Sequence, residues 1–387
     1  MERVADVERA LRAAAPHTLV DVVAEFLRER YGADRVVLRL ADYGMTTLQA
    51  VEPSGSVTEG VPINGSPQGR AFGTQEPFVE AGPRLPDATI HLPVTIRGDR
   101  MGVLTVTVPA DRYTQALLPE MAHLCEALGH EILVAERDTD LYVLARRASR
   151  LTLAAELQWQ LLPGRSCARP EFSLGAHLEP AYAIFGDNFD WSVSADHLTL
   201  TVTNGMGEGI EAALLTNLVV NALRNARRAG LDLVDQAYLA DQAVYAHYRG
   251  AMYASVLLLR FDLATGEVEA VDAGSPRMWR LRRREVEAVP FDAQLPLGMF
   301  EETAYVAERF QVLPGDRLLI GSDGVYETVS STGEHYGERA LALSLAANSL
   351  LPPSQVPRAV LRDLYDYRAA APLEDDALVV CLDWHGR

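Results

Sequence analysis

The chain has 387 residues, of which 48% are hydrophobic and 23% charged, as expected for a globular protein long enough for two domains. Its formal net charge of −18 argues against nucleic acid or an anionic membrane as the main partner. The odd count and wide spacing of the three cysteines indicate neither a disulfide framework nor a zinc site, and no apolar run is long enough to span a membrane, so we expect a cytoplasmic protein.

The first part of the chain predicts helices followed by a sheet. Apolar spacing indicates helices over 2–15 and 17–31. Extended segments follow, and the clearest is a hairpin of 88–96 and 101–108 around the turn Arg97-Gly98-Asp99-Arg100. The other extended segments are 34–40, 45–51, 60–63 and 76–80, with a helix over 66–72. This order predicts an antiparallel sheet with helices packed against it.

Two stretches in this part, VPINGSPQGRAFGTQEPFV and LPVTIRGDRMGVLTVTVP, resemble the GAF family. The resemblance implies a GAF-like sensor domain over residues 1–112, with an unknown small ligand or none. No cluster of Cys or His marks a chromophore, haem or iron site in the presumed pocket. A docking or dimerisation domain with a filled core is the alternative interpretation, because this fold serves many functions.

A long helix is predicted from Tyr113 to Leu162, ended by Pro163, so we expect residues 113–162 to be a linker. Leu117, Met121, Leu124, Leu128 and Ile132 recur at spacings of three and four. One interpretation is a signalling helix that pairs with its copy in a homodimer. The other is a helix that packs on its own domain.

Beyond Pro163 the pattern predicts many strands with two long helices, 210–229 and 233–248, among them. Hairpin turns such as Ala264-Thr265-Gly266 and Pro314-Gly315-Asp316 indicate an antiparallel sandwich. The strands are expected at 174–177, 190–193, 198–203, 254–262, 267–272, 278–281, 286–289, 305–310, 317–321 and 377–382. The basic run Arg280–Arg284 falls at a hairpin tip and is interpreted as a solvated turn.

Acidic residues stand at the ends of several of these strands. Asp187 precedes one strand, Asp323 follows another, and Asp375-Asp376 precede a third. A fourth strand ends in Asn204-Gly205, inside the glycine-rich run NGMGEG. The run lacks the GxxxxGK[ST] spacing of a phosphate loop. Each acid alone is an ordinary turn residue, but several together favour a hard cation such as Mg²⁺ or Mn²⁺.

The motifs GD-x-F-D, NGMGEG-x-x-AALL, AGSP, LPLG, PGDRLL-x-x-SDGV and DDALVV stand in the order found in metal-dependent protein phosphatases of type 2C. The chain resembles the SpoIIE/RsbU-like branch most. The resemblance implies an α+β chain whose residues 163–387 form a four-layer α-β-β-α sandwich. It also implies hydrolysis of phosphoserine or phosphothreonine on a protein, with an anti-anti-sigma factor as the substrate suggested by this branch.

By the same resemblance, Asp187, Asn204 and Asp323 are the catalytic candidates. Two Mn²⁺ or Mg²⁺ ions, or a single one, are implied, with ligands drawn from Asp187, Asn204, Gly205, Asp323, Asp375 and Asp376. No nucleic acid and no membrane partner is expected.

The sequence departs from that pattern at Asn204, where the resemblance implies a bridging Asp, because an amide cannot bridge two cations as a carboxylate does. Glu208 and Ser275 are two further departures. Three hypotheses follow: an enzyme with a weaker or single-metal site, with or without charge restored by Glu208; a phosphatase-fold pseudoenzyme that binds or scaffolds partners; or deamidation of Asn204-Gly205 to Asp.

Overall fold

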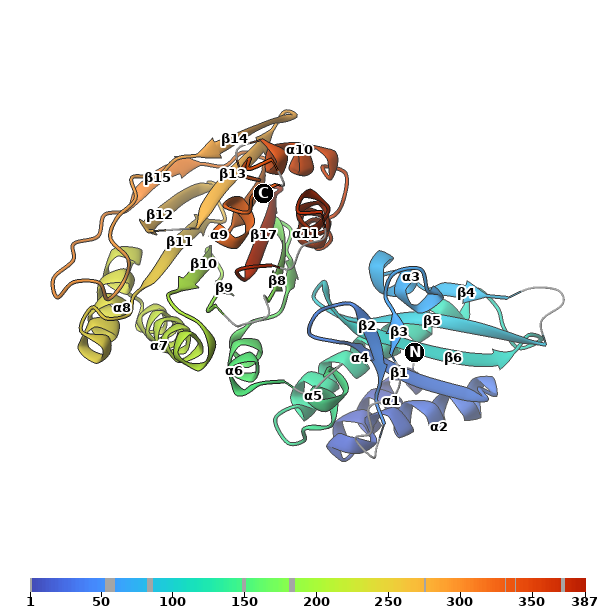
Figure 1. Cartoon of the computed structure of the whole chain (residues 1–387). Helices are drawn as coiled ribbons and strands as arrows, with labels where there is room; N and C mark the ends of the chain where they lie inside the picture. The colour runs from blue at the N-terminus through green and yellow to red at the C-terminus, as the bar shows by residue number, and fades with distance from the viewer. Residues whose placement is uncertain are drawn as a thin grey trace. The chain divides into compact units, whose positions relative to one another are not determined.

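The computed structural model describes residues 2–52, 60–81, 86–147, 151–180, 185–274, 276–330, 332–337, 339–369 and 373–387. The chain forms two compact units, Met1–Arg150 and Leu151–Arg387 (Figure 1). Among the described residues no helix combines the length and the apolar character needed to cross a membrane. Ser275 lies outside the described residues.

The first unit is built around an antiparallel sheet with the strand order β3-β2-β1-β6-β5-β4 in its described part. The predicted hairpin is confirmed as β5 and β6, and Arg97 and Gly98 at its tip have positive φ, as a tight two-residue turn requires. The strands are β1 (Arg35–Ala41), β2 (Thr47–Ala50), β3 (Val61–Pro62), β4 (Phe78–Glu80), β5 (Asp87–Ile96) and β6 (Asp99–Pro109).

Helices pack against this sheet with their apolar sides. The core contains side chains from α1, α2 and α4 together with β1, β5 and β6. A smaller apolar cluster, which includes Phe72 of α3 and Leu48 of β2, fills the space beneath α3. The helices are α1 (Glu2–Ala13), the short 3-10 turn η1 (Pro16–Thr18), α2 (Leu19–Tyr31), α3 (Pro67–Thr74), α4 (Leu117–Ala135) and α5 (Leu141–Ala145).

The prediction of one helix from Tyr113 to Leu162 is wrong. The segment contains α4, α5 and, in the second unit, α6 (Leu153–Leu161). The expected stripe for pairing with a second copy is buried in the first unit, since Met121, Leu124, Leu128 and Ile132 all belong to its core. The interpretation of a helix that packs on its own domain therefore holds for α4, and residues 113–162 are divided between the two units.

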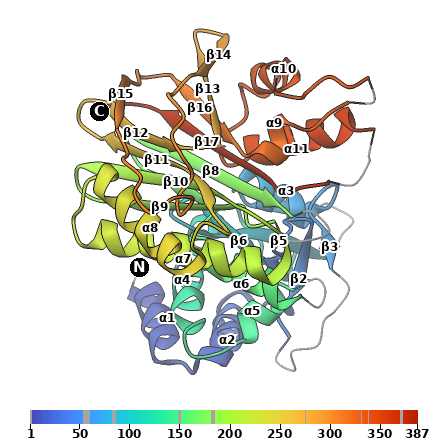
Figure 2. The ribbon, with the colours of Figure 1, turned by 60° about the vertical axis from the view of Figure 1, so that its left-hand side comes forward.

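The second unit contains two antiparallel sheets packed face to face, with helices outside each (Figure 2). In the described residues, one sheet has the order β15-β12-β11-β10-β9 and the other β14-β13-β16-β17-β8-β7. The strands are β7 (Ser166–Ala168), β8 (Phe172–Glu179), β9 (Asn188–Val193), β10 (His197–Gly205), β11 (Ala254–Asp262), β12 (Glu267–Ala273), β13 (Arg277–Arg282), β14 (Glu285–Val289), β15 (Glu308–Gln311), β16 (Arg317–Gly321) and β17 (Ala377–Trp384).

Three apolar cores lie between the four layers. One is formed by side chains of both sheets, such as Leu200 of β10 and Ile320 of β16. The second joins the β10 sheet to its helices, and the third joins the β16 sheet to the helices on the other side. These helices are α7 (Gly209–Arg228) and α8 (Leu233–Tyr248) on one side, and α9 (Asp323–Tyr326), α10 (Ala340–Ala347) and α11 (Val356–Tyr367) on the other. The expected α-β-β-α arrangement is present.

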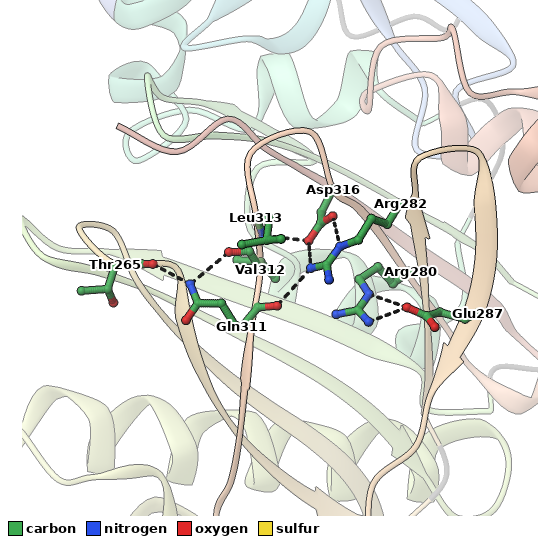
Figure 3. A network of polar contacts seen from close by, with 8 residues as sticks. All are labelled: Thr265, Arg280, Arg282, Glu287, Gln311, Val312, Leu313 and Asp316. Carbon is green, nitrogen blue, oxygen red and sulfur yellow. Dashed lines mark hydrogen bonds and ion pairs between the residues drawn. The ribbon is translucent and has the colours of Figure 1, made fainter.

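The predicted hairpin tip between β13 and β14 is confirmed, with Arg283 and Arg284 exposed and at positive φ. Behind the tip, the Arg282 guanidinium donates to both carboxylate oxygens of Asp316, at 2.7 and 2.6 Å, and to the Gln311 carbonyl (Figure 3). Arg280 pairs with Glu287 across the hairpin. The contacts of Arg282 link the hairpin to the turn before β16. Arg280 and Arg282 of the basic run therefore stabilise the fold, whereas Arg283 and Arg284 are solvent-exposed.

The three cysteines are free and buried, each in a different core. Cys125 lies in the core of the first unit and Cys167 between the two sheets. Cys381 lies between the β16 sheet and its helices. Such burial is typical of cysteines that serve as small apolar side chains.

Candidate functional site

Four chain segments meet at one end of the sandwich. β9 begins directly after Asp187 and pairs with the end of β10, so that Asn188 lies opposite Thr203. In the facing sheet, β16 ends just before Asp323 and pairs with the start of β17, with Gly321 opposite Val379. Asp375 and Asp376 immediately precede β17. Antiparallel pairing therefore gathers the acids that the sequence predicts, because each stands at a strand end on the same edge.

A cavity of about 260 Å³ opens at this edge. Four of the predicted site residues line it, namely Asn204, Gly205, Asp323 and Asp375. The other lining residues are Phe185, Met206, Gly207, Tyr253 and Ser255, which the sequence analysis did not identify as site residues. Ser255 lies opposite Asn204 in the β10–β11 pair, so a strand register could have indicated it.

The side chain of Asn204 joins the two sheets across this cavity. Its amide nitrogen donates to Oδ1 of Asp323 at 2.6 Å. The same oxygen accepts from the backbone N–H of Gly324 at 2.9 Å. The amide therefore supplies partial positive charge to Asp323, where an aspartate at position 204 would repel it.

Asp187 is not among the residues that line the cavity. It is fully buried, and neither of its carboxylate oxygens makes a hydrogen bond among the described residues. Burial, together with the negative charges of Asp376 and Asp323, raises the pKa of Asp187 well above its ordinary value, while the nearby Ser322 hydroxyl opposes the shift. A buried carboxylate without a partner is costly, so this position calls for a cation or a proton.

Asp375 and Asp376 differ in what they contact. Asp375 lines the cavity, and burial together with the charge of Asp323 raises its pKa to about 6. Asp376 is fully buried and accepts from the Gln158 amide at 2.8 Å and from the Phe185 backbone N–H at 3.0 Å. Asp375 is thus available to a ligand in the cavity, whereas Asp376 is held by Gln158 of α6.

Gly324 allows the two acidic segments to approach each other. A Cβ at position 324 would lie 2.1 Å from the carbonyl oxygen of Asp376 and 3.3 Å from the Cβ of Asp375. No side chain fits at that distance from a backbone oxygen. The Asp-Gly pair that follows β16 is therefore required by packing as well as by its carboxylate.

The residues fit a divalent cation in donor chemistry, because Asp187, Asp323 and Asp375 place carboxylate charge at one edge and Asp187 has no partner. However, no three His, Cys, Asp or Glu side chains of the described residues are grouped so as to hold a metal ion. The side-chain amide of Asn204 donates to Asp323, and that of Gln158 donates to Asp376. Two of the four acids are therefore already hydrogen-bonded to amide groups.

This geometry argues against a role of Glu208 in restoring charge and against deamidation of Asn204. Glu208 is exposed in the turn before α7 and is not among the cavity-lining residues, so it does not return the missing charge to position 204. The backbone nitrogen of Gly205, which would attack the Asn204 side chain in deamidation, donates to the Gly186 carbonyl at 3.2 Å within a paired strand. That hydrogen bond opposes the attack.

Comparison with known proteins identifies relatives of part of the chain. Residues 194–385 match the family model of Stage II sporulation protein E (SpoIIE). Protein IcfG of Synechocystis sp. is 20% identical over 221 residues, which cover 50% of this chain and 35% of IcfG. Phosphoserine phosphatase RsbU of Bacillus subtilis is 19% identical over 207 residues, which cover 53% of this chain and 62% of RsbU. The chain thus spans less than two thirds of either relative.

Solved structures are similar to part of the chain. The PP2C phosphatase domain of SpoIIE from Bacillus subtilis matches with a TM-score of 0.49 and 19% identity, over 56% of this chain and 65% of that one. The PP2C domain of SiaA from Pseudomonas aeruginosa matches with a TM-score of 0.49 and 20% identity, over 55% of this chain and 84% of that one.

Proposed function

We propose that this chain is a metal-dependent protein serine/threonine phosphatase of bacterial signalling, because residues 194–385 match the family model of Stage II sporulation protein E (SpoIIE). The observation that carries the proposal is the fully buried carboxylate of Asp187, whose oxygens make no hydrogen bond among the described residues, close to the charges of Asp323 and Asp375, which line a small cavity. A volume of about 260 Å³ is below the usual range for drug-sized ligands, which suits a single phosphorylated side chain.

Asp187, Asp323 and Asp375 would hold Mn²⁺ or Mg²⁺, with Asn204, the Gly205 carbonyl and Asp376 as further candidate ligands. When bound, such ions polarise a phosphoryl group and lower the pKa of a bound water. Asn204 keeps Asp323 oriented towards the cavity, and Gln158 and the Phe185 N–H fix Asp376. We expect one cation to bind more tightly than a second, since position 204 contributes no charge.

The substrate we propose is phosphoserine or phosphothreonine on a protein, and an anti-anti-sigma factor is one such protein. The similarity to phosphoserine phosphatase RsbU supports this choice. We further propose that the first unit is a GAF-like regulatory domain, with a small ligand or none, and that the protein works in the cytoplasm. The apolar cluster beneath α3 favours a filled core over an open ligand pocket there.

The alternative function is a phosphatase-fold binding module without catalysis. It is favoured by the hydrogen bond between Asn204 and Asp323, which occupies one acid of the site with an amide. In that case the cavity binds a phosphorylated partner or none, and the α-β-β-α layers serve as a scaffold.

Hydrolysis of p-nitrophenyl phosphate and of a phosphoserine peptide, with and without Mn²⁺, tests the proposal. We expect Mn²⁺-dependent turnover that Asp323→Asn reduces at least 100-fold, while Asp292→Asn, an exposed acid outside the cavity, leaves it unchanged. Turnover that persists in Asp323→Asn or in a chelator would contradict the proposal.

Asn204→Asp separates the two functions. In an enzyme with a weak cation site, the added carboxylate lowers the Mn²⁺ concentration needed for half-maximal turnover, because it adds charge next to Asp323. In a binding module, the native chain is inactive and the substitution alone creates turnover. Asn204→Ser, which adds no charge, is the control.

A further inference from the structure

Three large apolar side chains are exposed in the turn that lines the cavity and in the first turns of the helix that follows it. Ile210 and Leu214 lie one helical turn apart on the same face of α7, and they are 39% and 45% exposed. Met206, in the turn that leads into this helix, is 42% exposed. The opposite side of α7 packs into the core through residues such as Leu215 and Val219. We call Met206, Ile210 and Leu214 the apolar rim.

The apolar rim is continuous with the cavity. Met206 belongs to both, because it also lines the cavity together with Tyr253. The terminal methyl of Met252 lies 3.3 Å from the position that a Cβ on Gly207 would take, which places another apolar side chain against the same turn. A residue whose side chain enters the cavity therefore brings its chain neighbours onto this apolar surface.

The charges around the rim restrict its partner. Glu208 and Glu211 are exposed next to Ile210, and the chain as a whole carries a formal net charge of −18. A partner surface that also carries basic residues is attracted, whereas an acidic one is repelled. The combination of apolar and acidic groups is complementary to an apolar segment flanked by Lys or Arg.

We propose that the apolar rim binds the polypeptide on either side of the phosphorylated residue and so selects substrates with apolar residues near the phosphate and basic residues beyond them. This inference rests on the proposed phosphatase function. Leu214 is five residues into α7, about 8 Å from the start of the helix. An extended chain rises about 3.3 Å per residue and points alternate side chains to one face, so the second and fourth neighbours reach the rim.

Fluorescence anisotropy with labelled synthetic peptides tests the rim directly. Each peptide carries a non-hydrolysable phosphonate in place of phosphoserine and two terminal lysines, and Mn²⁺ is present. One peptide has leucine at the second and fourth positions on both sides of the phosphonate, and the other has serine there. We expect the full chain to bind the leucine peptide at least tenfold more tightly, which corresponds to about 1.4 kcal/mol.

The double substitution Ile210→Glu with Leu214→Glu should remove this preference, because it replaces the apolar surface by charge while glutamate keeps the helix. Leu350→Glu is the matched control, since Leu350 is 97% exposed and belongs to neither the rim nor the cavity lining. Circular dichroism verifies that the variants fold. Equal affinity for the two peptides in the native chain, or a preference that survives the double substitution, overturns the proposal.

Two further measurements distinguish peptide binding by the rim from an effect on catalysis and from self-association. Turnover of p-nitrophenyl phosphate, which has no flanking residues, should be the same in the native chain and the double variant. If the native chain does not turn over p-nitrophenyl phosphate, the proposed phosphatase function is wrong. The peptide affinities then still show whether the apolar rim binds the flanking residues. If sedimentation shows that the double substitution lowers the mass of the protein in solution, the rim joins two copies of the chain, and the proposal is wrong.

Discussion

The amide of Asn204 places a hydrogen-bond donor among the acids of the site. It donates to Asp323 at 2.6 Å, so it partly compensates a carboxylate that would otherwise face Asp375 without a donor side chain. Asp187 receives no such help and stays buried without a partner. The local imbalance between these two acids makes Asp187 the position that most needs a cation in the proposed function.

Asp272, on β12, provides a residue-scale prediction about pH. Burial, and to a lesser extent the charge of Glu308, raises its pKa from 3.8 to about 6. The hydrogen bond that the Gly274 N–H donates to it opposes this shift. The folded state therefore holds this proton at pH values where the unfolded chain has lost it. The protonated Asp272 therefore contributes to the stability of the folded state at about pH 4, and this contribution is lost as the pH rises through about 6.

Asp272→Asn keeps the oxygen that accepts from Gly274 and removes the charge. We expect this variant to match the native protein in stability near pH 4.5 and to exceed it by about 1 kcal/mol at pH 7. Urea unfolding at several pH values, followed by tryptophan fluorescence, measures the difference. A difference that does not change with pH would contradict the pKa assignment.

At the scale of elements, α6 is attached to the site through one buried side chain. Gln158 is 2% exposed, and its amide donates to Asp376 at 2.8 Å and to the carbonyl of Asp187 at 3.1 Å. The end of the same helix is held by Arg224 of α7, which donates to the carbonyl of Leu161 at 2.7 Å. The positions of Asp187 and Asp376 therefore both depend on the position of α6.

We expect Gln158→Leu to lower the free energy of unfolding of the second unit by roughly 1–3 kcal/mol, because the Asp376 carboxylate loses the amide donor at 2.8 Å and the Asp187 carbonyl loses the one at 3.1 Å. Gln160→Leu on the same helix is the control, because Gln160 is exposed and bonds to Glu156. Equal losses in the two variants would mean that the contact with Asp376 contributes nothing.

The elements that sequence could predict are those whose pattern is local. The hairpin of β5 and β6 follows from alternation and the Arg97-Gly98 turn, and Asp187, Asp323 and Asp375 follow from acids at strand ends. The single helix over 113–162 failed, because one apolar stripe does not reveal whether its partner is a second copy or the sheet of its own unit. Gln158 was missed for the same reason: its partner Asp376 is 218 residues away.

At the scale of the whole molecule, each unit has apolar cores of its own. All four tryptophans, Trp159, Trp191, Trp279 and Trp384, belong to the second unit. We expect two unfolding transitions, because separate cores lose their packing separately. Far-ultraviolet circular dichroism should follow both transitions, and tryptophan fluorescence the second unit alone. A single coincident transition for the two signals would show that the units unfold as one.

The distribution of the free thiols has a practical consequence. Cys125, Cys167 and Cys381 each lie in a different core, and burial raises the pKa of the Cys125 and Cys381 thiols. Each sulfur therefore stays unreactive towards an alkylating reagent until its own core opens. Mass spectrometry of peptides from a timed labelling reaction would then record, cysteine by cysteine, the order in which the layers of this protein come apart.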